Sequence, residues 1–93
     1  MKSYETLQKE HEKIQQEVID NLVFLMGSVS TKGPKRPGLN LTFKINQVTR
    51  TRHIRKELEP AVRDMTARWR RLRILLRKLS DINWEKLNRG MTW

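Results

Sequence analysis

Apolar side chains recur at helical spacing in the N-terminal part of the chain. The repeating positions are Tyr4, Leu7, His11, Ile14, Val18 and Leu25. Steps of three and four residues place such side chains on one face of an α-helix. Ser3 is a residue type that caps helices at their start, and Gly27 is one that stops them. The pattern therefore predicts a helix over residues 3–26.

A second periodic stretch lies in the C-terminal part of the chain. Its apolar positions follow alternating steps of four and three residues: Leu58, Val62, Met65, Trp69, Leu72, Leu76 and Leu79. Such a seam is typical of a helix that packs lengthwise against another helix. We expect its residues to form the core, although Trp69 could instead stack on a nucleic-acid base.

Proline and polar residues divide this stretch into shorter helices. Pro60 lacks a backbone N–H and disfavours helix in the residue before it, so we expect one helix over 47–58 and another over 60–79. Asn46 is a suitable cap for the first of these. Ser80 or Asp81 would cap a last short helix over 81–89, closed by Gly90.

The middle of the chain carries two different patterns. Residues 27–38, "GSVSTKGPKRPG", hold three of the four glycines and two of the three prolines, which predicts a loop. Residues 39–46, "LNLTFKIN", alternate apolar and polar side chains, as a strand does. No second strand is predicted. This extended segment would therefore pair with a second subunit, add to another protein's sheet, or lie across the helices.

These elements predict a mainly α fold. A chain of 93 residues is long enough for one core but not for two. We therefore expect a single helical domain over 1–93, built as an antiparallel helical hairpin or a small helical bundle. One short strand at 39–46 and a basic loop would complete it.

The net charge of the chain indicates which kind of partner the protein binds. Twenty Lys and Arg against ten Asp and Glu give a net charge of +10. Residues 1–27 hold three Lys and five acids, whereas residues 28–93 hold seventeen Lys and Arg and five acids. Such an excess on a small domain usually indicates a polyanionic partner. We therefore expect nucleic acid to bind the C-terminal two thirds.

The basic residues of the predicted helices form a regular row. Lys56, Arg63, Arg70 and Arg77 are seven residues apart and would share one side of a helix. The loop over 27–38 would be either a solvated connector or a flap that touches phosphates. The full predicted interface is Lys56, Arg63, Arg70, Arg71, Arg77 and Lys78, helped by Arg50, Arg52, Arg55, Lys32, Lys35 and Arg36.

The sequence thus favours a non-catalytic nucleic-acid-binding protein that grips the phosphate backbone, with weak sequence preference and strong salt dependence. Its size suits an accessory subunit of a larger nucleoprotein complex, comparable in class with the helical small subunits of CRISPR effector complexes. An alternative is an interaction subunit that docks on an acidic protein. Ile74, which lies opposite the seam, would then offer a second contact surface or a site of self-association.

A second alternative is a DNA-binding transcriptional regulator. The strand and the two helices after it resemble the ribbon-helix-helix repressors over residues 39–79. In that family paired strands enter the major groove, which would make Asn40, Thr42 and Lys44 the reading residues. The chain departs from the family where the helices meet, because Pro60 stands where a glycine-containing turn is usual.

Other chemistry finds little support. Without cysteine the chain has no disulfide, thiolate zinc site or cysteine nucleophile. Neither His11 nor His53 has an acid and a nucleophile at motif spacing, and no glycine-rich phosphate loop is present. We therefore expect no catalytic residue, metal or cofactor. The N-terminus lacks the apolar region of a signal peptide, and the longest apolar run, residues 22–26, cannot cross a bilayer. A soluble cytoplasmic protein, or a nuclear one in a eukaryote, is expected, with no membrane partner.

Overall fold

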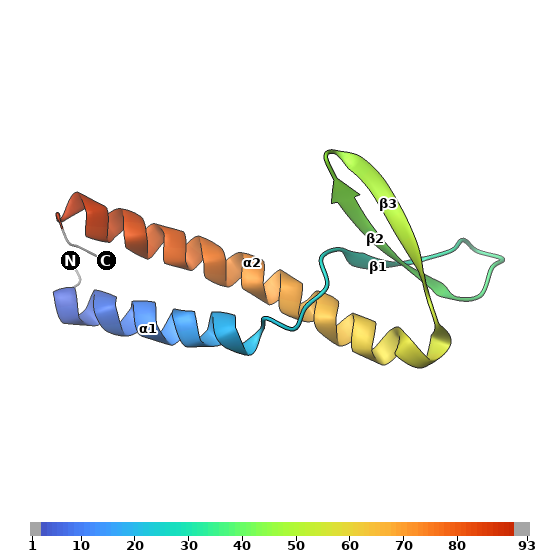
Figure 1. Ribbon diagram of the computed structural model, residues 1–93, viewed down its shortest axis with the longest axis horizontal. Coiled ribbons are helices and arrows are strands. Elements are labelled where there is room, and N and C mark those ends of the chain that lie inside the picture. The colour runs from blue at the N-terminus through green and yellow to red at the C-terminus, as the bar shows by residue number, and fades with distance from the viewer. Residues whose placement is uncertain (1–2, 91–93) are drawn as a thin grey trace. The chain divides into compact units, whose positions relative to one another are not determined.

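The computed structural model describes residues 3–90 and has an α+β fold. In chain order its elements are α1 (Tyr4–Asp20), β1 (Ser28–Thr31), β2 (Leu39–Ile45), β3 (Val48–Ile54), the short 3-10 helix η1 (Lys56–Leu58) and α2 (Glu59–Asn88) (Figure 1). The three strands form one sheet. The predicted mainly α fold, a helical hairpin or small bundle, is therefore wrong.

The sheet is antiparallel, with β2 between β1 and β3. The predicted strand over 39–46 is confirmed as Leu39–Ile45. Its expected pairing with a second subunit or another protein is wrong, because both of its edges are occupied by strands of the same chain. The outer edge of β3 carries no further strand in this sheet.

The helix expected over 47–58 is replaced by β3 and η1. Asn46 and Gln47 have φ angles of 49° and 67°, the left-handed conformation that a two-residue hairpin turn needs. Asn46 therefore turns the chain instead of capping a helix. After the turn, β-branched residues such as Val48 and Thr49 favour a strand, and β3 pairs with β2 along its whole length.

The loop expected over 27–38 is shorter, because its first residues form β1. Gly27 leads into this strand with a φ of +123°, which an L side chain rarely adopts. A Cβ atom there would lie only 2.5 Å from the carbonyl oxygen of Thr42 on β2. Gly27 thus permits the close approach of β1 to β2.

Gly27→Ala is expected to destabilise the protein more than Gly33→Ala does. Gly33 has nearly the same φ, +125°, but no atom within 4 Å of an added Cβ. Both variants strain the backbone, so their difference isolates the collision with Thr42, which should cost about 1–3 kcal/mol. Urea unfolding of both variants measures it. Equal losses of unfolding free energy would contradict the close approach.

Helix α1 ends at Asp20, six residues before the expected end at 26. The residues after it leave the helix and pack on α2 instead. The backbone N–H of Leu25 donates to the carbonyl of Met65 (3.2 Å), and the ring of Phe24 stacks on that of Trp69 at 5.3 Å. These contacts outweigh the helical pattern of the sequence, since propensity is a weak determinant beside tertiary packing.

Helix α2 runs unbroken through the two helices expected over 60–79 and 81–89. Pro60 is its second residue, where a missing N–H costs little because the first turn has no intrahelical acceptor. Ser80 and Asp81 lie exposed within the helix and cap nothing. Gly90 closes it as expected, with a φ of +68° and its N–H bonded to the carbonyl of Leu87 (3.0 Å).

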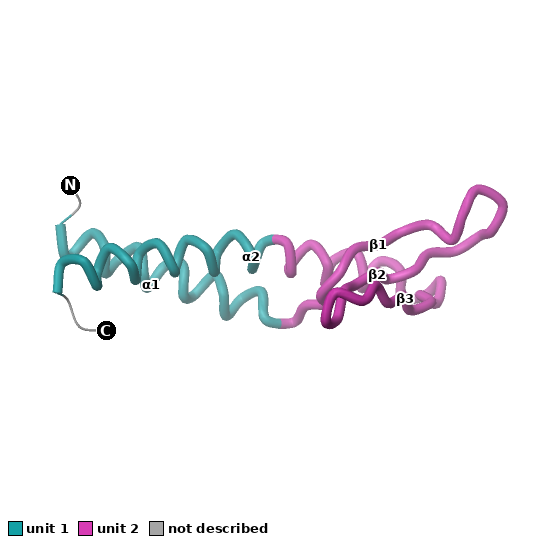
Figure 2. Tube along the Cα trace, turned by 90° about the horizontal axis from the view of Figure 1, so that it is seen from above, with its two compact units in different colours: residues 1–22, 71–93 teal, residues 23–70 magenta. Residues whose placement is uncertain are grey.

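The chain divides into two compact units (Figure 2). We call residues 1–22 and 71–93 the helical unit and residues 23–70 the sheet unit. The buried apolar residues of the helical unit are Leu7, Leu72, Leu75 and Ile82, and those of the sheet unit are Leu41 and Ile54.

The core of the helical unit departs from the predicted seam at one position. Leu75 is 1% exposed, whereas Leu76, which the seam required, is 47% exposed. A straight α-helix has 3.6 residues per turn, so a heptad row drifts by about 20° per repeat and the neighbouring leucine takes over the buried place. Leu58 also lies outside the core, in η1, and is exposed.

Candidate nucleic-acid interface

The positive charge is concentrated in the sheet unit. Residues 23–70 contain eleven Lys and Arg and three Asp and Glu, a net charge of +8. The helical unit contains nine Lys and Arg and seven acids, a net charge of only +2. Residues 28–93 include the whole of α2, so the charge along the sequence does not separate the basic sheet unit from the nearly neutral helical unit.

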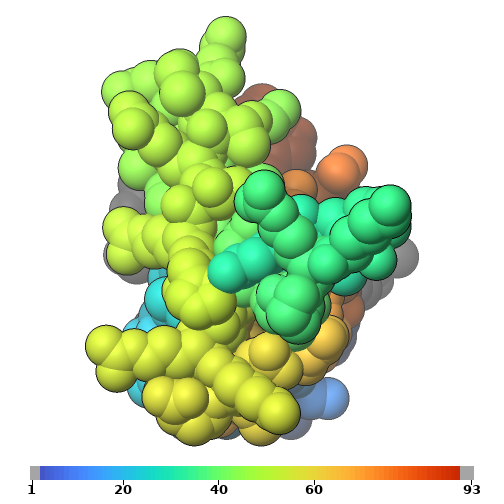
Figure 3. Space-filling view, turned by 90° about the vertical axis from the view of Figure 1, so that its right-hand side faces the viewer, coloured from blue at the N-terminus to red at the C-terminus, as the bar shows by residue number. Residues whose placement is uncertain are grey.

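The strand register gathers basic residues that are distant in sequence. Thr31 pairs with Leu39, and Leu39 pairs with Ile54, so the loop 32–38 and the segment after β3 leave the sheet at the same end. Figure 3 shows this loop, in green, and the yellow segment around residue 55 on one face. We call the basic residues at this end the sheet-end cluster: Lys32, Lys35, Arg36, Arg55 and Lys56.

Two further arginines lie on β3. Arg50 is paired with Phe43 and Arg52 with Leu41, so both arginines project from the same face of the sheet. The guanidinium of Arg52 lies 5.1 Å from the centre of the Phe43 ring, a cation–π contact that still leaves its N–H groups exposed. Lys44 projects from the opposite face and is exposed as well.

The predicted row along one helix is only partly present. Arg63 and Arg70 lie exposed on α2 in the sheet unit, but Lys56 precedes the helix in η1 and belongs to the sheet-end cluster. The remaining predicted residues are in the helical unit. Of these, Arg77 and Lys78 are exposed, whereas Arg71 donates to the Glu17 carboxylate at 2.7 Å.

Most cations of the sheet unit have no internal partner. Across residues 23–70, all of which the structure describes, the one ion pair joins Arg68 to Asp64 at 3.1 Å. Arg68 also donates to the carbonyl of Val23 (3.3 Å). The other ten Lys and Arg side chains of this unit form neither an ion pair nor a hydrogen bond. Nine of these ten residues are exposed and Lys32 is half-buried, so their charges are accessible to an anion that approaches.

An aromatic groove of about 480 Å³ lies next to these arginines. Its walls include Phe24, Phe43 and Trp69 together with Arg52. Trp69 is half-buried, and its ring lies nearly parallel to that of Phe24, with 15° between their planes. Aromatic rings beside a cationic side chain are the means by which proteins stack unpaired bases. Sequence reasoning considered Trp69 for this role but missed Phe43, whose place on a strand facing an arginine was hidden by the helix expected over 47–58.

The other face of the sheet is polar. Thr42 and Ser30 share a hydroxyl hydrogen bond of 2.8 Å across β1 and β2, and Asn40 is half-buried beside them. The Ser30 hydroxyl also lies 3.5 Å from the backbone carbonyl of Asn40. The resemblance to ribbon-helix-helix repressors is not sustained, because β2 is the middle strand of its own sheet and has no free edge for a strand of a second subunit.

The two histidines belong to different units. His53 is exposed on β3, and His11 is bonded to Lys86 in the helical unit. Within residues 3–90 no group of three or more His, Cys, Asp or Glu side chains is arranged to hold a metal ion. No helix in this part of the chain is long and apolar enough to cross a bilayer. No family model, curated protein or solved structure matches the chain.

Proposed function

We propose that the protein is a non-catalytic nucleic-acid-binding protein that holds the sugar-phosphate backbone with its sheet unit. The observation that carries this proposal is the set of ten Lys and Arg side chains in residues 23–70 that form neither an ion pair nor a hydrogen bond within the chain. Cations that are not neutralised within a protein attract polyanions and release the counterions of the nucleic acid on binding.

The sheet-end cluster supplies the main phosphate contacts, and Arg50, Arg63 and Arg70 extend them. Such contacts read no sequence, so binding is weakly specific. The aromatic groove beside Arg52 suits an unpaired base, which favours single-stranded over double-stranded ligands. The α+β fold removes the basis for a likeness to the helical small subunits of CRISPR effector complexes.

A role as accessory subunit accompanies this proposal. The chain is small and brings charge rather than catalytic groups, so other protein subunits are expected to supply the chemistry. A cytoplasmic location, or a nuclear one in a eukaryote, is part of the same proposal. The competing function is docking on an acidic protein, which the same unpaired cations would also serve.

A salt titration with single-stranded and double-stranded DNA and RNA tests the proposal. Four to five phosphate contacts should make log K fall with log salt with a slope of about −4 for a duplex and about −3 for a single strand. Fluorescence anisotropy between about 50 and about 200 mM salt measures these slopes.

Polyglutamate serves as the matched polyanion in this experiment. It carries charge without phosphates or bases, so it should bind more weakly than a single strand of equal charge. Absence of nucleic-acid binding at the lowest salt would overturn the proposal. Equal affinity for polyglutamate would favour the acidic protein partner.

A further inference from the structure

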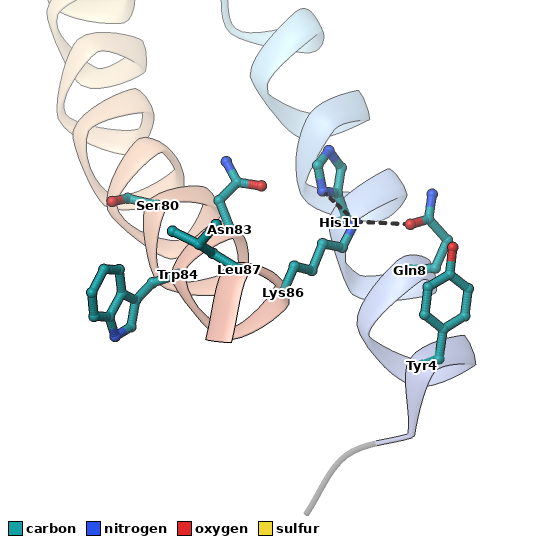
Figure 4. Close-up of a pocket in the computed structure, with 8 residues that line it drawn as sticks. All are labelled: Tyr4, Gln8, His11, Ser80, Asn83, Trp84, Lys86 and Leu87. Carbon is teal, nitrogen blue, oxygen red and sulfur yellow. Dashed lines mark hydrogen bonds between the residues drawn. The ribbon is translucent and has the colours of Figure 1, made fainter. Parts of the chain in front are cut away.

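The two long sides of the helical unit differ in character. α1 lies antiparallel to the second half of α2, since Gln8 contacts Lys86 and Glu17 contacts Arg71. One side of this pair is charged, with Glu10, Lys13 and Glu17 opposite Arg71 and Lys78. The other side contains a groove of about 730 Å³, lined by Tyr4, Gln8, His11, Ser80, Asn83, Trp84, Lys86 and Leu87 (Figure 4).

Large apolar side chains line this groove and remain exposed. Trp84 is 65% exposed, Tyr4 is 55% exposed and Leu87 is 51% exposed. Leu76 lies on the same side of α2 as Leu87, because residues 76, 80, 83 and 87 follow helical steps of four, three and four. The polar Ser80 and Asn83 lie between Leu76 and Leu87, so the exposed apolar surface is carried by Tyr4, Leu76, Trp84 and Leu87. Large apolar side chains exposed together around a tryptophan mark a contact surface.

The floor of the groove is cationic. Lys86 is only 2% exposed, and its ammonium donates to Gln8 Oε1 (2.8 Å) and contacts His11 Nδ1 (3.1 Å), as Figure 4 shows. No Asp or Glu is among the described residues that line the groove. A buried ammonium is stabilised by a nearby carboxylate, so a partner that combines apolar and acidic side chains suits this groove.

The chain itself contains such a partner. Apart from the residues of the charged side, α1 carries three acids and one lysine, a net charge of −2, whereas residues 71–88 of α2 carry three Lys and Arg and two acids, a net charge of +1. We propose that two copies of the chain pair through this groove, with α1 of each copy against α2 of the other. Two-fold pairing places each acidic helix beside a basic one and covers the apolar side chains of each α2 with α1 of the other copy.

The dimensions of this surface suit a stable dimer. A helix of 17 residues is about 25 Å long, and two packed helices with their side chains are about 20 Å wide. A face of this size has a flat area of about 500 Å², and the relief of its side chains raises the accessible area toward the about 800 Å² that each partner buries in a standard interface. The pairing uses only the helical unit and does not depend on nucleic-acid binding.

Sedimentation equilibrium of the full chain tests the proposal. At micromolar concentration the protein should have twice its chain mass of 11.2 kDa. The double variant Trp84→Glu/Leu87→Glu should raise the dissociation constant at least 100-fold, since it buries two carboxylates against apolar side chains. Ile74→Glu is the matched control, because Ile74 is 51% exposed but is not part of the groove. It should leave the dimer intact.

Each outcome decides the proposal. A monomeric wild-type protein would overturn it and leave the groove for a different protein. A double variant that keeps its helical circular dichroism and still dimerises, or an Ile74→Glu variant that loses the dimer, would overturn it as well. The proposal is supported if the double variant loses the dimer and the Ile74→Glu variant keeps it.

Cross-linking gives a second readout that does not depend on a charged variant folding. The chain has no cysteine, so single-cysteine variants report one position each. With a short bis-maleimide, Leu87→Cys should cross-link between copies far more efficiently than Ile74→Cys. Equal yields from the two variants would overturn the proposed interface.

Discussion

The triple variant Arg36→Gln/Arg55→Gln/Lys56→Gln is expected to bind nucleic acid about 10²–10³-fold more weakly near 0.1 M salt. These three side chains come from the two segments that leave the sheet at the same end, and none of them has an internal partner. Each lost phosphate contact should reduce the salt slope by about 0.7–0.9. Anisotropy titrations at several salt concentrations measure both quantities.

The matched control removes the same charge from the helical unit. Lys9, Lys13 and Arg73 are exposed there, and their change to glutamine also lowers the net charge by three. This variant should keep most of the affinity, because nonspecific attraction falls off with distance in salt. Equal losses for the two triple variants would contradict a localised interface, and an unchanged affinity of the first would exclude the sheet-end cluster.

Leu75→Ala is expected to lower the free energy of unfolding by about 2–5 kcal/mol. Leu75 is 1% exposed, and only four apolar residues of the helical unit are buried, so the cavity has few neighbours that could fill it. This loss is a large part of the about 5–15 kcal/mol that stabilises a typical domain. Chemical denaturation followed by circular dichroism measures it.

Leu76→Ala is the control for this variant, since it removes the same atoms from the next residue. Leu76 is 47% exposed, so its truncation should cost less than about 1 kcal/mol at concentrations too low for dimers. If Leu76→Ala lowered the free energy of unfolding more than Leu75→Ala, then Leu76 would be the core residue, as the heptad pattern of the sequence predicts. That result would contradict the packing of α2.

The helices and the middle strand could be predicted from the sequence because each of them buries one side. β3 could not, because six of its seven residues are exposed and only Ile54 is buried. An edge strand without a buried face lacks the alternation of apolar and polar residues that identifies strands. Its arginines at 50 and 52 fit the outer side of a helix equally well, and the turn at Asn46–Gln47 lacks the glycine that usually marks one.

The candidate site, too, could be predicted from the sequence only in part. Charge and composition indicated that Lys and Arg make up the candidate site, since their excess over Asp and Glu is visible in the sequence. Their grouping depends on the register that aligns Thr31, Leu39 and Ile54. Arg36 and Arg55 are 19 positions apart in sequence, but this register brings the segments that carry them to the same end of the sheet. No local sequence pattern predicts this grouping. The aromatic groove was missed for the same reason.

The free outer edge of β3 has a consequence for how the protein behaves in solution. Unpaired N–H and C=O groups along an edge strand are a template for strands of other molecules, and charged side chains are a common protection against such aggregation. Arg50 and Arg52 place such charges on this edge strand. A variant that neutralises both arginines would therefore lose solubility as well as nucleic-acid binding. The triple variant at Arg36, Arg55 and Lys56, which lie outside β3, tests binding without this loss of solubility.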